Sequence, residues 1–312
     1  MSTFYIKGGT TLNGSVTIPS AKNAILPILA CSIMCGDVVT IKSISRFSDV
    51  DYMVKILSEL GCITEFQDDN LIIDPRPSDK YCIPEEYTKK IRSSIFMLGP
   101  LVARFGKAKV AYPGGCNIGS RPIDLHIKGL QSLNVKIEER HGFIYCEAKN
   151  IIGGEVHLDF PSVGATENIM MASVFGKGTT KIYNAAKEPE IEDLQNFINA
   201  MGGKVKGAGT STIEVVGVNK LGGGEYTPIS DRIIAGTYMI ACASAGGKIE
   251  LNNTNYAHNT ALISKLKQSG CNIKLKNDTI YVEVGHRLKS ISLLETLPYP
   301  GFPTDLQSQM LT

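Results

Sequence analysis

A pattern recurs along the chain at a nearly constant interval. Four amphipathic helix patterns end at a turn residue and lead directly into a pair of strand patterns; these turn residues are Gly61, Asn134, Gly202 and Gly270. Their spacings are 73, 68 and 68 residues. Because a fixed period means that each interval forms the same supersecondary unit, the sequence predicts a repeat architecture.

Each interval has the order strand, helix, strand, helix and then two strands. In the first interval the strand patterns include Val16–Ile18 and Val38–Ile41, and the helix patterns span residues 23–35 and 51–60. The fourth interval follows the same order and opens with a strand pattern over residues 226–229. Strands that alternate with amphipathic helices predict an α/β fold, in which helices cover one face of each sheet.

Composition excludes several classes of protein. The 312 residues are enough for two domains, and 43% hydrophobic and 20% charged residues are typical of a soluble globular chain. The net charge of +2, without a basic block, gives no indication of nucleic-acid binding. The longest apolar stretch, residues 24–35, is too short to span a bilayer, so no membrane insertion is predicted. The first residues do not resemble a signal peptide.

Eight cysteines are scattered along the chain. They include no CxxC pair and no cysteine–histidine spacing of a zinc site, so the sequence predicts neither bound zinc nor a redox pair. Scattered cysteines without a disulfide framework indicate a reduced cytoplasm.

The segment PGGCNIGSRPIDL, residues 113–125, combines an unusual set of residue types. Gly114 and Gly115 leave no side chains over Cys116, and Arg121 adds a permanent positive charge in the same loop. A helix pattern follows at once. An accessible thiol near a cation and a helix N-terminus favours the thiolate, and the same groups suit a phosphate. The alternative is an inert core cysteine, although a core cysteine needs no loop glycines.

Other unusual polar residues fall in strand-to-helix loops of different intervals. They are Lys22–Asn23, Arg92, Ser162–Gly164 and Thr304–Asp305. We therefore expect several helix N-termini to face one cleft and to present free amides to an anion. Each residue also has an ordinary interpretation as a solvated lysine, a surface ion pair or a helix N-cap.

Long motifs match one known family, in order, along nearly the whole chain. They are SAKNAILPILA at 20–30, IRSSIFMLGPLVARFG at 91–106, PGGCNIGSRPIDLHIKGL at 113–130, FPSVGATENIMMA at 160–172, EPEIEDLQNFINAMG at 188–202, DRIIAGTYM at 231–239 and GFPTDLQSQ at 301–309. On these motifs the chain resembles the UDP-N-acetylglucosamine enolpyruvyl transferases (1-carboxyvinyltransferases) of the EPSP synthase family. Ser20 stands where that family usually has glycine. The related enolpyruvylshikimate-phosphate synthases share the fold but lack the cysteine loop.

The resemblance implies a two-domain inverse α/β barrel built from repeated βαβαββ units. Residues 22–230 would form a complete three-repeat domain. Residues 1–21 and 231–312 would form a second, incomplete domain that lacks about half of its expected length. The last helix pattern begins near Asp305 and stops at Thr312, so we expect uncovered apolar faces there.

The resemblance also implies a reaction, the first committed step of peptidoglycan synthesis and hence of cell-wall biogenesis, cell shape and division. The enolpyruvyl group of phosphoenolpyruvate moves to the 3-hydroxyl of UDP-N-acetylglucosamine by addition and elimination, with release of phosphate. The resemblance makes Cys116 the acid that protonates the alkene carbon and the attachment point of the antibiotic fosfomycin. Asp305 would handle the proton of the sugar hydroxyl. No cofactor and no metal are implied.

The remaining site residues carried by the resemblance bind the two substrates. For phosphoenolpyruvate they are Lys22, Asn23 and Arg121. For UDP-N-acetylglucosamine they are Arg92, Arg121, Pro122, Ile123, Asp124, Leu125, Ser162, Val163, Gly164 and Asp305.

Three interpretations stay open at this point. The chain is a truncated transferase sequence, an inactive fragment or pseudo-enzyme that binds UDP-N-acetylglucosamine or a partner without turnover, or a member of the enolpyruvylshikimate-phosphate branch. The cysteine loop disfavours the third. Because the phosphate clamp of the family continues beyond the matched motifs, we expect this chain to turn over much more slowly than a full-length relative. The sequence does not give the oligomeric state.

Overall fold

The computed structural model describes residues 3–112, 123–285 and 287–312. The chain divides into two compact units, a larger unit of Ser20–Ile229 and a smaller unit of Met1–Pro19 with Ser230–Thr312. Among the helices that the structure describes, none has the length and apolar character needed to cross a bilayer.

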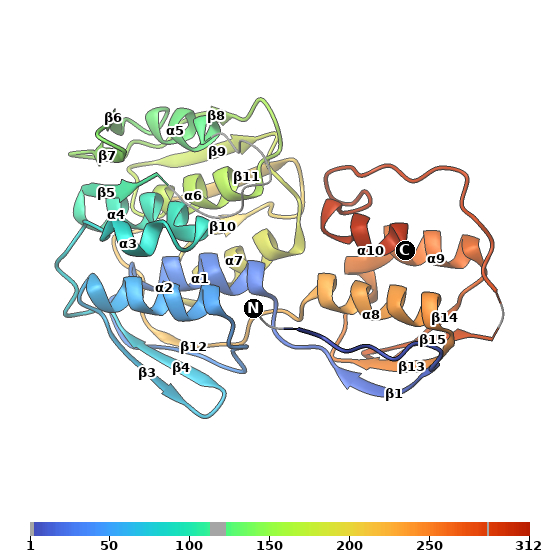
Figure 1. Ribbon diagram of the computed structural model, residues 1–312. Helices are drawn as coiled ribbons and strands as arrows, with labels where there is room; N and C mark the ends of the chain where they lie inside the picture. The colour runs from blue at the N-terminus through green and yellow to red at the C-terminus, as the bar shows by residue number, and fades with distance from the viewer. Residues whose placement is uncertain (1–2, 113–122, 286) are drawn as a thin grey trace. The chain divides into compact units, whose positions relative to one another are not determined.

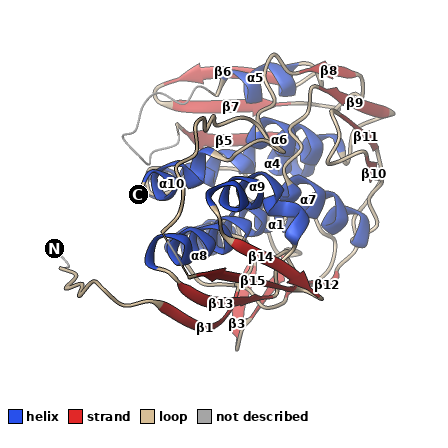
Figure 2. Ribbon diagram, turned by 90° about the vertical axis from the view of Figure 1, so that its right-hand side faces the viewer, coloured by secondary structure: helices blue, strands red, loops and turns tan. Residues whose placement is uncertain are grey.

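The described residues of the larger unit form three sheets (Figure 1). In hydrogen-bonded order, the first contains β12 (Gly224–Tyr226), β2 (Val39–Ile41), β4 (Asn70–Asp74) and β3 (Ile63–Gln67). The second contains β5 (Lys107–Ala111), β7 (Phe143–Glu147) and β6 (Lys136–Arg140), which Figure 2 shows side by side. The third contains β8 (Glu155–His157), β9 (Thr179–Tyr183), β11 (Thr212–Val216) and β10 (Val205–Lys206).

The smaller unit holds one sheet, in the order β1 (Leu12–Thr17), β13 (Gly247–Asn252), β15 (Thr279–Val284) and β14 (Asn272–Lys276). Its helices α8 (Arg232–Ala245) and α9 (Thr260–Ser269) lie on one face of this sheet (Figure 1). Shorter helical segments complete the unit; they are η2 (Tyr256–Asn259), η3 (Thr304–Leu306) and α10 (Gln307–Leu311).

The predicted repeat is visible in the strand order. In each four-stranded sheet the first two strands form a parallel pair, and the other two form an antiparallel hairpin. The second strand of the hairpin, in chain order, pairs with the inner strand of the parallel pair. The four recurring turn residues, Gly61, Asn134, Gly202 and Gly270, all have positive φ angles, from 65° to 109°. Glycine and asparagine tolerate this left-handed conformation, which ends a helix and redirects the chain into the hairpin. The turn chemistry therefore explains the sequence period.

One part of the predicted repeat was wrong. The strand pattern Val16–Ile18 was assigned to the first interval, but β1 pairs in parallel with β13 of the fourth. Conversely, the pattern over residues 226–229 was assigned to the fourth interval, but β12 pairs in parallel with β2 of the first. A parallel strand reaches its partner through a long crossover, so its neighbour in the sequence need not be its neighbour in the sheet. The opening strand of each of these two repeats is therefore supplied by a distant part of the chain, although both strands lie within the unit whose sheet they complete.

Helices from three repeats form the core of the larger unit, and the sheets surround them (Figure 1). Residues 24–32 of α1 (Lys22–Ser32) and residues 165–173 of α6 (Val163–Ser173) are all buried. Between them pack η1 (Arg92–Met97) and α4 (Leu98–Phe105). A helix buried on every side needs no polar face, which is why the buried part of α1 is almost entirely apolar and α6 is mostly so.

Among the described residues of this unit, four further helices have a solvent-facing side. They are α2 (Ser48–Glu59), α3 (Glu85–Thr88), α5 (Asp124–Gln131) and α7 (Pro189–Ala200).

Candidate functional site

The beginnings of three helical segments meet around the imidazole of His126, which lies in the first turn of α5. Arg92 is the first residue of η1 and Asp124 the first of α5, and the charges of both act on the ring. Gly164 is the second residue of α6, and a Cβ atom built on it would lie 3.1 Å from Cε1 of His126 and 3.1 Å from Cε1 of Phe96. Glycine therefore lets α6 begin against the two rings. Three residues that the sequence predicted for the site, Arg92, Asp124 and Gly164, are brought together.

The environment of His126 keeps its ring uncharged at neutral pH. Burial lowers the pKa of the imidazole, the guanidinium of Arg92 lowers it further, and Asp124 opposes both, so that the pKa falls to about 4. Nδ1 lies 2.8 Å from Nδ2 of Asn168, a buried side chain of α6. The site thus pairs a permanent cation with a neutral ring.

The N-terminus of α6 offers backbone donors beside this ring. Ser162 is the N-cap, and its Oγ accepts a hydrogen bond of 3.4 Å from the N–H of Ala165. The N–H groups of Val163 and Gly164 have no acceptor among the described residues. Free amides and the positive end of the helix dipole favour a bound anion at this position.

The N-terminus of α1 has similar properties. Lys22 and Asn23 are its first two residues, and both are exposed. The N-cap, Ala21, has no polar side chain to satisfy the first amides. Because α1 packs against η1, the helices that begin with Lys22 and Arg92 are neighbours within the larger unit.

The other predicted residues that the structure describes lie outside the cluster around His126 or only at its edge. Ile123 and Leu125 flank Asp124 and are half-buried. Asp305 is the exposed second residue of η3 and belongs to the smaller unit. Three more predicted residues, Cys116, Arg121 and Pro122, lie outside the described residues.

Sequence reasoning missed the polar residues buried inside α6. Thr166, Glu167 and Asn168 are fully buried in a helix that is otherwise almost entirely apolar. Neither carboxyl oxygen of Glu167 has a hydrogen-bond partner in the part of the chain that the structure describes. Burial raises the pKa of this carboxyl, and the charges of Glu190 and Glu188 raise it further.

A second buried acid, Asp193 of α7, forms hydrogen bonds with strand β12 and the segment that follows it. Its Oδ1 accepts a hydrogen bond of 2.6 Å from the hydroxyl of Tyr226 in β12, and its Oδ2 accepts one of 3.1 Å from the N–H of Ile229. Burial raises the pKa of Asp193 to about 6, although these two bonds lower it. Asp193 therefore has a structural role, in joining α7 to the strand that completes the first sheet.

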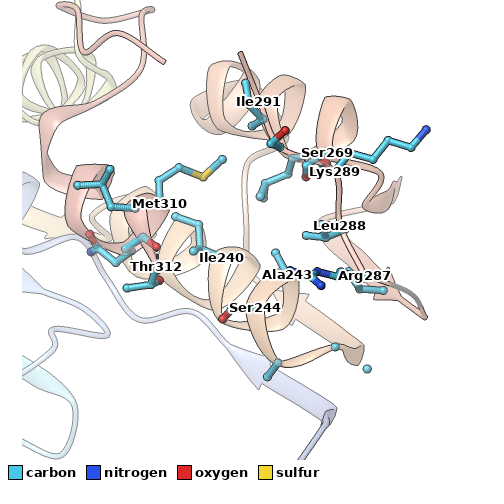
Figure 3. Close-up of a pocket in the computed structure, with 18 of the residues that line it drawn as sticks. Ile240, Ala243, Ser244, Ser269, Arg287, Leu288, Lys289, Ile291, Met310 and Thr312 are labelled. Atoms are coloured by element: carbon cyan, nitrogen blue, oxygen red, sulfur yellow. Dashed lines mark hydrogen bonds between the residues drawn. The ribbon is translucent and has the colours of Figure 1, made fainter. Parts of the chain in front are cut away.

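In the part of the chain that the structure describes, no group of three or more histidine, cysteine, aspartate or glutamate side chains is placed to hold a metal ion. One groove of about 870 Å³ lies in the smaller unit (Figure 3). Its lining includes Ile240 and Ala243 of α8, Leu288, and Met310 of α10. It contains none of the predicted site residues, so the candidate site is the cluster of helix N-termini and not this groove.

Comparison with known proteins identifies the class of protein. The sequence profile of the family described as EPSP synthase (3-phosphoshikimate 1-carboxyvinyltransferase) matches residues 6–312. The structure resembles the enolpyruvyl transferase NikO from Streptomyces tendae with a TM-score of 0.84 at 17% identity, covering 97% of this chain and 72% of that one. An EPSP synthase from Acinetobacter baumannii aligns with a TM-score of 0.65 at 18% identity, covering 89% of this chain and 65% of that one. The chain belongs to the EPSP synthase family, and the predicted fold class is confirmed.

Within this family, named relatives point to one branch. The chain is 50% identical, over its whole length, to UDP-N-acetylglucosamine 1-carboxyvinyltransferase 2 of Caldanaerobacter subterraneus subsp. tengcongensis, of which it covers 75%. It is 45% identical to the enzyme of the same name from Clostridium tetani, again over the whole chain and 75% of the relative. The chain thus spans about three quarters of the length of these relatives, and the resemblance stated from the motifs is confirmed.

Proposed function

We propose that this protein transfers the enolpyruvyl group of phosphoenolpyruvate to the 3-hydroxyl of UDP-N-acetylglucosamine, in the first committed step of peptidoglycan synthesis. Identity of 45–50% to relatives named for this activity supports the choice of substrates. The single structural observation that carries the proposal is the meeting of Arg92, the free amides of Val163 and Gly164, and His126. Both substrates are anions, and cations with helix amides are the groups that hold phosphate and diphosphate.

The residues divide between the two substrates. Lys22, Asn23 and Arg121 hold phosphoenolpyruvate, and the uncapped start of α1 adds backbone amides to this group. The residues for the nucleotide sugar are Arg92, Arg121, Pro122, Ile123, Asp124, Leu125, Ser162, Val163, Gly164 and Asp305.

Addition and elimination account for the chemistry without a cofactor. The sugar oxygen forms a bond to C2 of phosphoenolpyruvate while Cys116 delivers a proton to C3, and Asp305 takes the proton of the hydroxyl. The tetrahedral product then loses the proton from C3 and expels phosphate, which restores the double bond. An ordinary thiol, with a pKa of about 8.5, is within range of proton transfer near neutral pH.

We place the reaction in a reduced cytoplasm. The seven cysteines that the structure describes are all free, and six of them are buried. Free cysteines throughout a chain of this size are typical of a reducing compartment.

The proposal is tested by product formation with two alternative acceptors. The 312-residue protein is incubated with phosphoenolpyruvate and either UDP-N-acetylglucosamine or shikimate 3-phosphate, and the products are detected by mass spectrometry. We expect an enolpyruvyl adduct of UDP-N-acetylglucosamine with matching phosphate release, at a rate well below that of a full-length relative.

The other outcomes select the alternatives. An adduct of shikimate 3-phosphate alone would assign the chain to the enolpyruvylshikimate-phosphate branch. Calorimetric binding of UDP-N-acetylglucosamine without any product would support the inactive binder, and neither binding nor product would refute both forms of the proposal.

A further inference from the structure

The side-chain amide of Asn168 joins four helical segments of the larger unit. Its Oδ1 accepts a hydrogen bond of 2.8 Å from the N–H of Gly99 in α4. Its Nδ2 donates one of 2.8 Å to the carbonyl of Ile95 in η1, and lies 2.8 Å from Nδ1 of His126 in α5. Because the oxygen faces a backbone N–H and the nitrogen a backbone carbonyl, the amide has one satisfied orientation.

The packing around Asn168 is built for this contact. A Cβ atom on Gly99 would lie 2.4 Å from the backbone oxygen of Asn168 and 2.9 Å from its Oδ1. Only glycine lets α4 approach α6 closely enough for the bond between the Gly99 N–H and the amide oxygen. Since Asn168 is fully buried, water does not compete for these bonds.

The orientation of the amide decides which nitrogen of His126 carries the proton. An amide nitrogen donates hydrogen bonds and does not accept them, so Nδ1 of His126 must be the acceptor. The proton of the neutral ring is therefore on Nε2. A Cβ atom on Gly164 would lie 3.3 Å from Nε2, which places this N–H at the beginning of α6. Among the described residues the ring of His126 forms a hydrogen bond only through Nδ1, and the side chain keeps a small exposed area.

We infer that Asn168 is a positioning residue, which fixes His126 as the Nε2–H tautomer and thereby directs a neutral donor at an anionic oxygen of the nucleotide sugar. This inference rests on the proposed function. The diphosphate is the chemical group that fits, because Arg92 acts on the same ring and the amides of Val163 and Gly164 lie beside it. Asn168 itself does not reach the substrate.

The tautomer is measured directly by nitrogen-15 NMR of the full chain labelled at histidine. The signals of His126 are those that disappear in His126→Asn. In the unchanged protein we expect a protonated Nε2 and an unprotonated Nδ1. In Asn168→Asp a carboxylate faces Nδ1 and accepts instead of donating, so we expect the proton to move to Nδ1. Asn199→Asp is the matched control, because Asn199 also bonds backbone groups through both amide atoms, those of Val205, at the end of α7.

Affinity for UDP-N-acetylglucosamine, measured by calorimetry, supplies the second readout. We expect Asn168→Asp to bind about tenfold or more weakly, as for the loss of one hydrogen bond to a charged group, and Asn199→Asp to bind normally. An Nδ1–H tautomer in the unchanged protein overturns the inference, even if Asn168→Asp does not fold. A tautomer switch without loss of affinity overturns the role of the donor. If the unchanged protein does not bind the sugar at all, the proposed function fails, while the spectrum still decides whether Asn168 sets the tautomer.

Discussion

The buried imidazole of His126 makes the stability of the larger unit depend on pH in a defined direction. In the unfolded chain the ring takes up a proton as the pH falls below 6.5, whereas in the folded unit it does so only near a pKa of about 4. The unfolded state therefore gains protons first, and the folded state loses stability as the pH falls from about 7 to about 4. A difference of this size corresponds to about 3 kcal/mol over that range.

His126→Asn isolates this contribution. The asparagine oxygen takes the place of Nδ1 as acceptor for Asn168, so the variant keeps the hydrogen bond and removes the titrating group. The smaller side chain costs stability equally at every pH, so the informative quantity is the pH dependence of the difference between variant and unchanged protein. Urea unfolding followed by circular dichroism gives the free energy of unfolding at each pH. We expect the difference to change by about 3 kcal/mol between pH 7 and pH 4 in favour of the variant.

The matched control is His141→Asn, in the exposed turn between β6 and β7. His141 has a positive φ of 50°, a conformation that asparagine adopts readily. This variant controls for the loss of an imidazole at a position outside the site. If His126→Asn and His141→Asn show the same dependence on pH, His126 is not held neutral by its surroundings, and the reasoning about the site is refuted.

Two further predictions concern Glu167 and Cys116. Glu167→Gln is expected to gain stability relative to the unchanged chain as the pH rises above 4.5, because the carboxyl of the unfolded chain ionises there while the buried one, with its raised pKa, does not. Urea unfolding over that pH range measures the difference in the free energy of unfolding. A gain that grows toward low pH would contradict the prediction. Fosfomycin is expected to label Cys116 and not the exposed Cys82, as peptide mapping by mass spectrometry would show. Labelling spread over several cysteines would contradict the expectation that the Cys116 thiol is the reactive one.

The repeat was predictable from the sequence because local chemistry fixes its turns. The left-handed positions at Gly61 and Asn134 need residues that tolerate positive φ, and such residues are visible without a structure. The sequence period alone misplaced β1 and β12, because parallel pairing is decided by distant contacts, and only the family resemblance grouped residues 1–21 with residues 231–312. The hydrogen bond from Asn253 Nδ2 to the carbonyl of Ile18, for example, joins residues 235 positions apart.

The candidate site also contains residues that the sequence indicated and residues that it did not. Arg92 and Gly164 stood out in the sequence because they lie in strand-to-helix loops, and Asp124 was expected from the family resemblance; all three lie at the beginnings of helical segments. His126 and Asn168 were missed because a histidine or asparagine within a helix pattern is not by itself a signal of function. A signal was present, since residues 166–168 are three consecutive polar residues in a buried apolar helix. Buried polar groups require partners, and a search for those partners would have led to His126.

The central claim, that this protein is an enolpyruvyl transferase acting through Cys116, is tested most directly by product formation in three proteins. These are the unchanged chain, Cys82→Ala and Cys116→Ala, each incubated with phosphoenolpyruvate and UDP-N-acetylglucosamine and analysed by mass spectrometry for the enolpyruvyl sugar. We expect the product from the unchanged chain and from Cys82→Ala, and none from Cys116→Ala. Equal product from Cys116→Ala, or no product from the unchanged chain, would contradict the claim.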